Sequence, residues 1–188
     1  MVREYEINGI YDSIWRDLAR ATKDYKSEYR WLNLATAHPT RGCSVRTVVL
    51  REAIAQKKTV RVHTDLRAQK ISEIEHCPLV TAHFHNRRKG IQIRITGRAS
   101  IAPPDIQKSA WNILSQRQKS LYRADPKPGR VIQNVTSSEL PVKGNFKHFC
   151  VIDIKAEEID WLLVNRSSQL RARLICKRKK VISEWIAP

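Results

Sequence analysis

The chain has 188 residues, and its 35 Lys and Arg against 18 Asp and Glu give a formal net charge of +17. Hydrophobic residues make up 41% of it, with 5 Trp, which is enough for a folded core and argues against a disordered protein. No stretch approaches the roughly 20 apolar residues of a membrane helix, and the N-terminus lacks the apolar block of a signal peptide. We therefore expect a single domain, residues 1–188, in the cytoplasm and not in a membrane.

The first half of the chain predicts one amphipathic helix followed mainly by strands. Ile10, Ile14, Trp15 and Leu18 recur at helical spacing, so a helix is expected at about residues 9–25, covering a barrel end. A second, short helix is expected at residues 67–76, where Pro78 follows. Runs of alternating apolar and polar residues predict five strands, at residues 31–37, 44–51, 59–63, 79–85 and 91–101.

The second half predicts a helix, a long loop and three more strands. Apolar residues from Ile106 to Leu114 indicate a helix, with Asp105 as its expected N-cap. Residues 124–145 carry prolines and glycines with little periodicity, and we expect them to form the most mobile loop. The closing strands are expected at residues 149–154 and onwards to 163, 170–176 and 181–186. The fold class is therefore mainly β with α, a small barrel with peripheral helices.

Several common kinds of site are not supported by the sequence. The cysteines are far apart with no Cys-x-x-Cys pair, so neither a zinc site nor a thioredoxin-like motif is expected: Cys43, Cys77, Cys150 and Cys176. No Ser/His/Asp arrangement or His-Glu-x-x-His helix occurs, and Gly97 lacks the companion glycines of a phosphate loop. No metal and no catalytic residue is assigned.

The segment from Arg46 to Gly97 favours a phosphorylated ligand. A strand over residues 46–51 would have an arginine at each end, and Lys70 follows seven residues after His63, early in a helix. Arginine binds phosphate oxygens through two parallel hydrogen bonds, and lysine adds a further cationic donor. We therefore expect a phosphate held against the sheet.

The order of these residues resembles the flavin-binding core of the pyridoxamine 5'-phosphate oxidase family. The family's pattern reads Arg-x-Val-Leu-Leu-Lys, Tyr-Thr-Asn, Ser-Arg-Lys and Arg-Gln-Val. The corresponding segments here are Arg46-Thr47-Val48-Val49-Leu50-Arg51, His63-Thr64-Asp65, Ala68-Gln69-Lys70 and Ile91-Gln92-Ile93. Trp161 and Arg171 stand ten residues apart, as do the family's flavin-contacting tryptophan and arginine. The resemblance extends from about Trp31 to the C-terminus.

The resemblance implies a split β-barrel that forms a homodimer and binds FMN between its subunits. Arg46 and Lys70 would neutralise the flavin phosphate, helped by Thr64 and Gln69. Backbone groups of residues 48–50 would run beside the isoalloxazine ring, Gln92 would bond its polar edge, and the partner subunit would supply Trp161 and Arg171. The implied FMN-binding set is Arg46, Thr47, Val48, Val49, Leu50, Arg51, His63, Thr64, Gln69, Lys70, Gln92, Trp161 and Arg171.

Some positions depart from the family's pattern. Gln69 stands where the family has an arginine, and Arg67 is a candidate to compensate for it. The Arg-x-His pair before the C-terminal flavin arginine falls on Ser167 and Gln169, and the family's substrate-phosphate tyrosine, arginine and serine have no clear counterparts. Residues 111–115 and 121–129 look like a less characterised, oxidase-related subgroup. The expected function is an FMN-dependent oxidoreductase of unassigned small-molecule substrate, with pyridoxamine 5'-phosphate oxidation a weak sub-hypothesis.

Each of these residues also has an ordinary structural interpretation. Arg46 and Arg51 would then be exposed charges at strand ends, and Lys70 would be a helix-surface lysine. Likewise, His63 would end a strand, Gln92 would pair across to a neighbouring strand, and Trp161 would belong to the core. Only their joint order favours the flavin interpretation.

The excess positive charge leaves two rival functions open. Residues 165–180 are rich in Lys and Arg and contain no acid, so the surface would attract polyanions such as nucleic acid. The same residues contain no aromatic side chain for base stacking, and Lys177–Lys180 and Arg87–Gly90 read as exposed hairpin tips. The rivals are a flavin-binding protein without turnover and a basic nucleic-acid-binding module on the same barrel.

Overall fold

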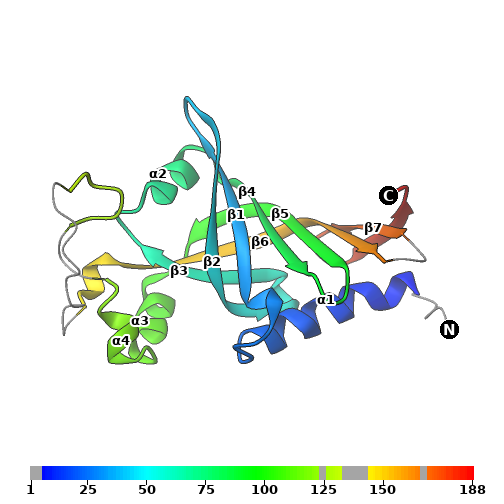
Figure 1. Cartoon of the computed structure of the whole chain (residues 1–188), viewed down its shortest axis with the longest axis horizontal. Coiled ribbons are helices and arrows are strands. Elements are labelled where there is room, and N and C mark those ends of the chain that lie inside the picture. The colour runs from blue at the N-terminus through cyan, green and yellow to red at the C-terminus, as the bar shows by residue number, and fades with distance from the viewer. Residues whose placement is uncertain (1–5, 123–125, 133–143, 166–168) are drawn as a thin grey trace.

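A computed structural model describes residues 6–122, 126–132, 144–165 and 169–188. Within these ranges, antiparallel strands form one sheet in the order β3-β2-β1-β4-β5-β6-β7-β8, and an additional pairing of β3 with β6 closes a barrel (Figure 1). The strand-rich barrel expected from the sequence is therefore confirmed. The strands are β1 Trp31–His38, β2 Gly42–Ile54, β3 Thr59–Asp65, β4 Leu79–Asn86, β5 Ile91–Ile101, β6 Phe149–Val164, β7 Gln169–Cys176 and β8 Val181–Ile186.

The long strand β6 joins the barrel to an outer hairpin. Its first half pairs with β3, its second half pairs with β7, and β5 pairs along most of its length. The β7–β8 hairpin therefore extends the sheet beyond the closed barrel. Residues 177–180 connect β7 to β8, as the predicted hairpin tip requires.

Helices lie around the barrel, and one of them differs from the prediction. The helix expected at residues 105–114 is α3, which ends at Asn112, and the separate helix α4 that follows it was not expected. The N-cap of α3 is Pro103, with Pro104 in the first turn, so the expectation that Asp105 caps it is wrong. Proline is favoured there because the first helical N–H groups have no acceptor inside the helix. The helices are α1 Ile7–Ala21, α2 Gln69–His76, α3 Pro104–Asn112 and α4 Gln116–Lys119, with short 3-10 turns η1 Glu28–Arg30, η2 Ala55–Lys57 and η3 Phe146–His148.

The predicted loop at residues 124–145 is only partly described. Residues 126–132 contain no helix or strand, while residues 124–125 and 133–143 lie outside the described residues. In the part of the chain that is described, no helix is long and apolar enough to cross a membrane.

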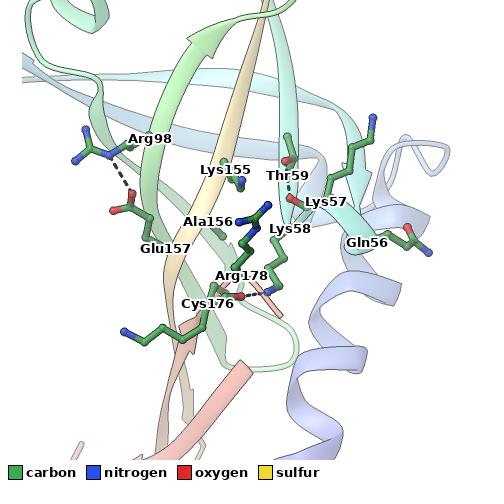
Figure 2. Close-up of a pocket in the computed structure, with 11 residues that line it drawn as sticks. Gln56, Lys57, Lys58, Thr59, Arg98, Lys155, Ala156, Glu157, Cys176 and Arg178 are labelled. Carbon is green, nitrogen blue, oxygen red and sulfur yellow. Dashed lines mark hydrogen bonds and ion pairs between the residues drawn. The ribbon is translucent and has the colours of Figure 1, made fainter. Parts of the chain in front are cut away.

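A β-bulge interrupts the pairing of β5 with β6. Thr96 pairs with Glu158 and Gly97 pairs with Ala156, so Glu157 is the extra residue. A Cβ atom added to Gly97 would lie 1.9 Å from the backbone oxygen of Lys155, so the two strands approach too closely for any other residue. Lys155, Ala156 and Glu157, on the β6 side of this bulge, are among the residues that line a surface hollow (Figure 2).

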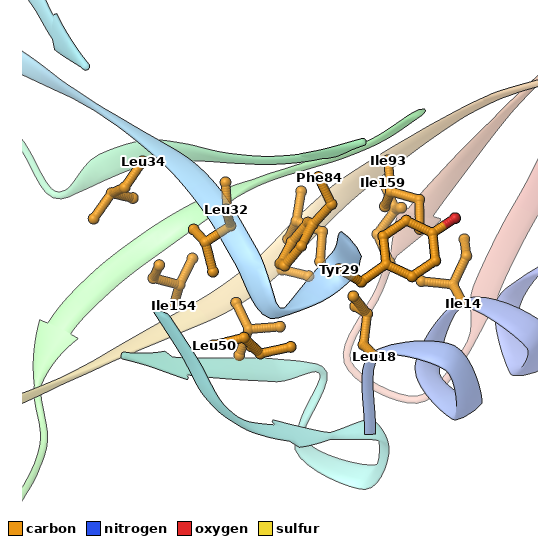
Figure 3. Close-up of a cluster of buried hydrophobic side chains, with 14 of the residues drawn as sticks. Ile14, Leu18, Tyr29, Leu32, Leu34, Leu50, Phe84, Ile93, Ile154 and Ile159 are labelled. Atoms are coloured by element: carbon orange, nitrogen blue, oxygen red, sulfur yellow. The ribbon is translucent and has the colours of Figure 1, made fainter. Parts of the chain in front are cut away.

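The main core fills the barrel and the space beneath α1. Ile14 and Leu18 on α1 lie against Tyr29, while Phe84 and Leu50 lie between the strands (Figure 3). Each fully buried side chain of this size contributes roughly 1.5–3 kcal/mol. The predicted amphipathic face of α1 is therefore confirmed. A second, smaller core joins α3 to the start of β6 through Ala102, Ala110, Leu114, Tyr122, Phe149 and Val151.

Candidate functional site

Four of the predicted site residues meet where β2, β3 and α2 converge. Lys70 Nζ donates a hydrogen bond to Thr64 Oγ1 at 2.8 Å. Arg46 Nη2 donates to Glu73 Oε2 at 2.8 Å, and Gln69 Nε2 donates to Glu73 Oε1 at 3.0 Å. We call these five residues, Arg46, Thr64, Gln69, Lys70 and Glu73, the α2 cluster.

A tight turn brings α2 back to the end of β3. The Asp65 carboxylate accepts a hydrogen bond from the Arg67 backbone N–H at 2.8 Å, and the Asp65 carbonyl accepts from Ala68 N–H at 3.0 Å. This Asx-type turn lets the helix begin at Gln69. Lys70 consequently returns to Thr64, six residues earlier in the chain.

Glu73 organises the α2 cluster and was not among the site residues predicted from the sequence. Its side chain is 1% exposed and accepts hydrogen bonds from Ser44 and Thr36 as well as from Arg46 and Gln69. Burial alone would raise the pKa of this carboxyl, but the hydrogen bonds and the charge of Arg46 outweigh burial and lower it. The i, i+4 spacing of Gln69 and Glu73 was the only sequence signal, because the remaining partners come from β1 and β2.

The charges of the α2 cluster suit a phosphate. Arg46 and Lys70 are positive and Glu73 is negative, which leaves one uncompensated positive charge. The pKa of Lys70 is lowered by burial and then by the charge of Arg46. An anion between the two cations would remove that repulsion, and both side chains form strong charge-assisted hydrogen bonds with phosphate oxygens. The residues present therefore fit a phosphate group.

Arg51 and His63 lie apart from the α2 cluster. Successive strand residues point to opposite faces, so His63 faces away from Thr64 and packs edge-on against Phe149 at 4.9 Å. Burial, followed by the charge of Arg51, lowers the pKa of His63 to about 3. Among the described residues, neither ring nitrogen of His63 nor Arg51 Nε has a hydrogen-bond partner, although all three atoms are buried. Such atoms usually have a partner, so this face has donors available for a polar ligand.

Gln92 and Arg171 form a third group, on the outer face of the sheet. With Asp160 they line a hollow of about 250 Å³, where Arg171 Nη2 donates to Asp160 at 2.8 Å. Gln92 also interacts with His83 across the strands at 3.3 Å. Strands β1 and β4 separate β5 from β2, which places Gln92 roughly 14 Å from β2 along the sheet. Within one protomer, Gln92 and Arg171 therefore do not reach the α2 cluster.

Two expectations do not fit the described geometry. Trp161 is 2% exposed and belongs to the main core. In this protomer its ring is therefore not accessible for the predicted contact with the flavin of a partner subunit. The Arg67 guanidinium binds Asp65 through Nε at 3.0 Å and Nη2 at 2.7 Å, and so is not a free replacement for the arginine missing at Gln69. Gln169 begins β7, while Ser167 lies outside the described residues.

Comparison with known proteins identifies the domain. Residues 12–103 match the family model described as the FMN-binding domain of pyridoxamine 5'-phosphate oxidase. Residues 12–103 are therefore homologous to the FMN-binding domain of this family. A relative from Arabidopsis thaliana, pyridoxine/pyridoxamine 5'-phosphate oxidase 2, is 28% identical over 177 residues, covering 86% of this chain and 89% of its own.

Solved structures of the family have the same fold. A pyridoxamine 5'-phosphate oxidase-related FMN-binding protein from Nostoc punctiforme superposes with a TM-score of 0.79 at 20% identity, covering 95% of this chain and 98% of that one. PhzG from Burkholderia lata, solved with tetrahydrophenazine-1-carboxylic acid, superposes with a TM-score of 0.76 at 17% identity, covering 94% and 91%. The barrel is therefore the split barrel of this family, and FMN is the cofactor of the domain.

The matched domain contains some of the predicted site residues and not others. The α2 cluster, Arg51, His63 and Gln92 all lie within residues 12–103, whereas Trp161 and Arg171 follow it. The α2 cluster thus lies within the segment that matches the family's FMN-binding domain.

Proposed function

We propose that this protein is an FMN-dependent oxidoreductase that acts on a small molecule, with FMN held at a homodimer interface. The single observation that supports it most strongly is the α2 cluster, in which Arg46 and Lys70 stand 24 residues apart in sequence but share one partly buried site with Thr64 and Glu73. This cluster lies inside the FMN-binding domain of the family.

Each residue of the α2 cluster has a separate role in this proposal. Arg46 and Lys70 would bind the phosphate oxygens, and the Thr64 hydroxyl would hold the Lys70 ammonium in place, as it does at 2.8 Å. Glu73 would orient Arg46 through the 2.8 Å hydrogen bond. Bound FMN supplies hydride transfer, while the protein provides orientation and local charge.

The separation of the site residues supports the homodimer. Thr47 and Val49 lie on β2 near the α2 cluster, whereas Gln92 lies on β5, beyond β1 and β4, and Arg171 lies on β7 of the outer hairpin. A second protomer would bring its own Arg171 to the flavin. Trp161 would need to leave the core to take part, and we do not include it in the proposed site.

The substrate would bind near Arg51 and His63, whose buried nitrogen atoms have no partner among the described residues. An anionic group on the substrate would complement Arg51. Pyridoxamine 5'-phosphate is a weaker candidate, because Gln169 replaces the histidine of the family's Arg-x-His pair. The plant relative is named for that activity, whereas PhzG was solved with tetrahydrophenazine-1-carboxylic acid.

The experiment is a spectrum followed by a titration. Purified protein should show flavin absorbance, or gain it with added FMN, and the flavin should co-elute with a dimer. Arg46→Ala should weaken FMN binding by about 10- to 100-fold, since one charge-assisted hydrogen bond contributes roughly 1.5–3 kcal/mol. Lys108→Ala, an exposed change on α3, is the control and should leave the affinity unchanged. A colourless monomer that ignores FMN would contradict the proposal.

Turnover separates an oxidase from a flavin-binding protein without catalysis. After reduction of the bound flavin, an oxidoreductase that uses oxygen should consume it in repeated cycles when a reductant is supplied. Flavin that binds and is never reoxidised, with any acceptor tried, would support the non-catalytic alternative instead.

A further inference from the structure

A second basic site lies far from the α2 cluster. A hollow of about 700 Å³ opens where the β2–β3 turn, the β5–β6 bulge and the β7–β8 turn meet (Figure 2). One of its lining residues, Glu157, is acidic. Its basic lining residues are Lys57, Lys58, Arg98, Lys155, Lys177 and Arg178.

The charge of the hollow is largely uncompensated. Six basic residues and one acid line it, which leaves a local charge of +5. Glu157 already accepts a hydrogen bond from Arg98 Nε at 3.0 Å, so the remaining cations share no acid among the lining residues. Concave surfaces lined by one sign of charge concentrate the potential and attract the opposite charge.

The walls of the hollow are held together through Lys58. Its carbonyl accepts a hydrogen bond from Ala156 N–H at 2.8 Å, and its ammonium donates to the Lys177 carbonyl. Its backbone has φ +52°, a left-handed conformation that glycine or asparagine adopts with less strain. These bonds fix the β2–β3 turn to the bulge at Gly97 and to the β7–β8 turn.

The side chains in Figure 2 divide into two sets. Arg178 lies between Lys58 and Lys155, whereas Lys57 extends away from them. The first three form the interior of the hollow, and we call them the hollow cations. Lys58 and Arg178 come from the β2–β3 and β7–β8 turns, and Lys155 comes from β6 beside the bulge, so three separate segments contribute one cation each.

The hollow is separate from the proposed flavin site. Thr59, which lines the hollow, begins β3, and Thr64 of the α2 cluster lies near the other end of the same strand. Five residues of strand separate them by about 17 Å. A ligand in the hollow would not occupy the α2 cluster.

We propose that this hollow binds a linear oligophosphate chain, either inorganic or the triphosphate of a nucleotide. Its volume lies in the range of small-molecule sites, about 300–1,000 Å³. No aromatic side chain occurs among its described lining residues, so it offers no platform for stacked bases and does not suit single-stranded nucleic acid. Several separated cations suit several linked phosphates.

Calorimetric titration with sodium tripolyphosphate tests the proposal on protein kept saturated with FMN. Binding should have a one-to-one stoichiometry, and Arg178→Ala should weaken it by about tenfold or more. The matched control is Arg117→Ala on α4, which is exposed and removes the same charge elsewhere. It should change the affinity by no more than about twofold, because long-range attraction alone is screened. Equal losses in the two variants would overturn the proposal.

Further measurements separate the hollow from the flavin site and identify the source of the phosphates. Arg46→Ala should leave tripolyphosphate binding intact; loss of binding there would place the anion in the α2 cluster and reject the hollow. ATP binding as tightly as tripolyphosphate would indicate a nucleotide, and weak ATP binding would indicate an inorganic chain. Lys155→Ala should reproduce the effect of Arg178→Ala, and circular dichroism checks that both variants are folded. No saturable tripolyphosphate binding by the wild type contradicts the inference.

Discussion

The guanidinium of Arg46 and the buried carboxylate of Glu73 lie 2.8 Å apart. Arg46 is thus already oriented by an acid that is almost inaccessible to water. The carboxylate also holds Gln69 and Ser44, so one side chain connects β2 to α2. The same contact leaves Lys70 as the cation of the α2 cluster without an acid bonded to it among the described residues.

Glu73→Gln should lower the free energy of unfolding by about 1–3 kcal/mol at pH 7, because buried donors lose a charged acceptor. Chemical denaturation measures this. Glu75→Gln, an exposed change on the same helix, is the control and should have almost no effect. The folded state lowers the pKa of Glu73, so its contribution is present above the ordinary value of 4.5 and is lost as the pH falls below it. In the variant, the free energy of unfolding should fall less as the pH drops below 4.5. Identical pH dependence in the variant and the wild type would contradict this role of Glu73.

His63→Phe should make the protein less sensitive to acid. The pKa of His63 is lowered from 6.5 to about 3 in the fold, so the unfolded chain takes up a proton first as the pH falls. Stability is therefore lost between pH 6.5 and 3. The variant should lose roughly 1–2 kcal/mol less across this range, after allowance for solvent around the half-buried ring. The free energy of unfolding is measured by urea denaturation at each pH. If its pH dependence were the same in the variant and the wild type, the lowered pKa of His63 would be contradicted.

Gly97→Ala should destabilise the barrel by about 2–4 kcal/mol, because its Cβ would meet the Lys155 carbonyl and push β5 from β6. Gly9→Ala provides a matched comparison. No atom lies within 4 Å of a Cβ at Gly9, in α1, and alanine favours the helix by about 0.5–1 kcal/mol. The thermal midpoint should fall in the first variant and rise slightly in the second.

Arg171→Ala tests the proposed contribution of the partner subunit. FMN affinity should fall several-fold while gel filtration still shows a dimer. Arg173→Ala, two residues further along β7 and paired with Glu184, is the control and should bind FMN normally. Equal affinities in both variants would exclude Arg171 from the flavin site.

The sequence predicted most strands because alternation of apolar and polar residues reports a half-buried strand directly. It did not predict α4, which the Ser115–Gln118 capping box starts just after the end of the expected helix. Helix boundaries depend on such local side-chain bonds more than on periodicity.

The candidate site was predicted unevenly. Arg46, Thr64 and Lys70 meet as expected, because the order of short motifs reflects the order of strands and the turn before α2. Glu73 was missed because its partners are distant in sequence. The prediction for Trp161 follows from a ten-residue spacing, which does not reveal that the strand turns this ring into the core.

The most direct test compares FMN with riboflavin, which lacks the phosphate. Wild-type protein should bind FMN at least about 100-fold more tightly, as expected when two cations each form a charge-assisted hydrogen bond. In the Arg46→Ala, Lys70→Met double variant this preference should shrink to less than about tenfold, with riboflavin affinity little changed. If the double variant kept the full preference for FMN, the phosphate would bind elsewhere and the account of the α2 cluster would be wrong.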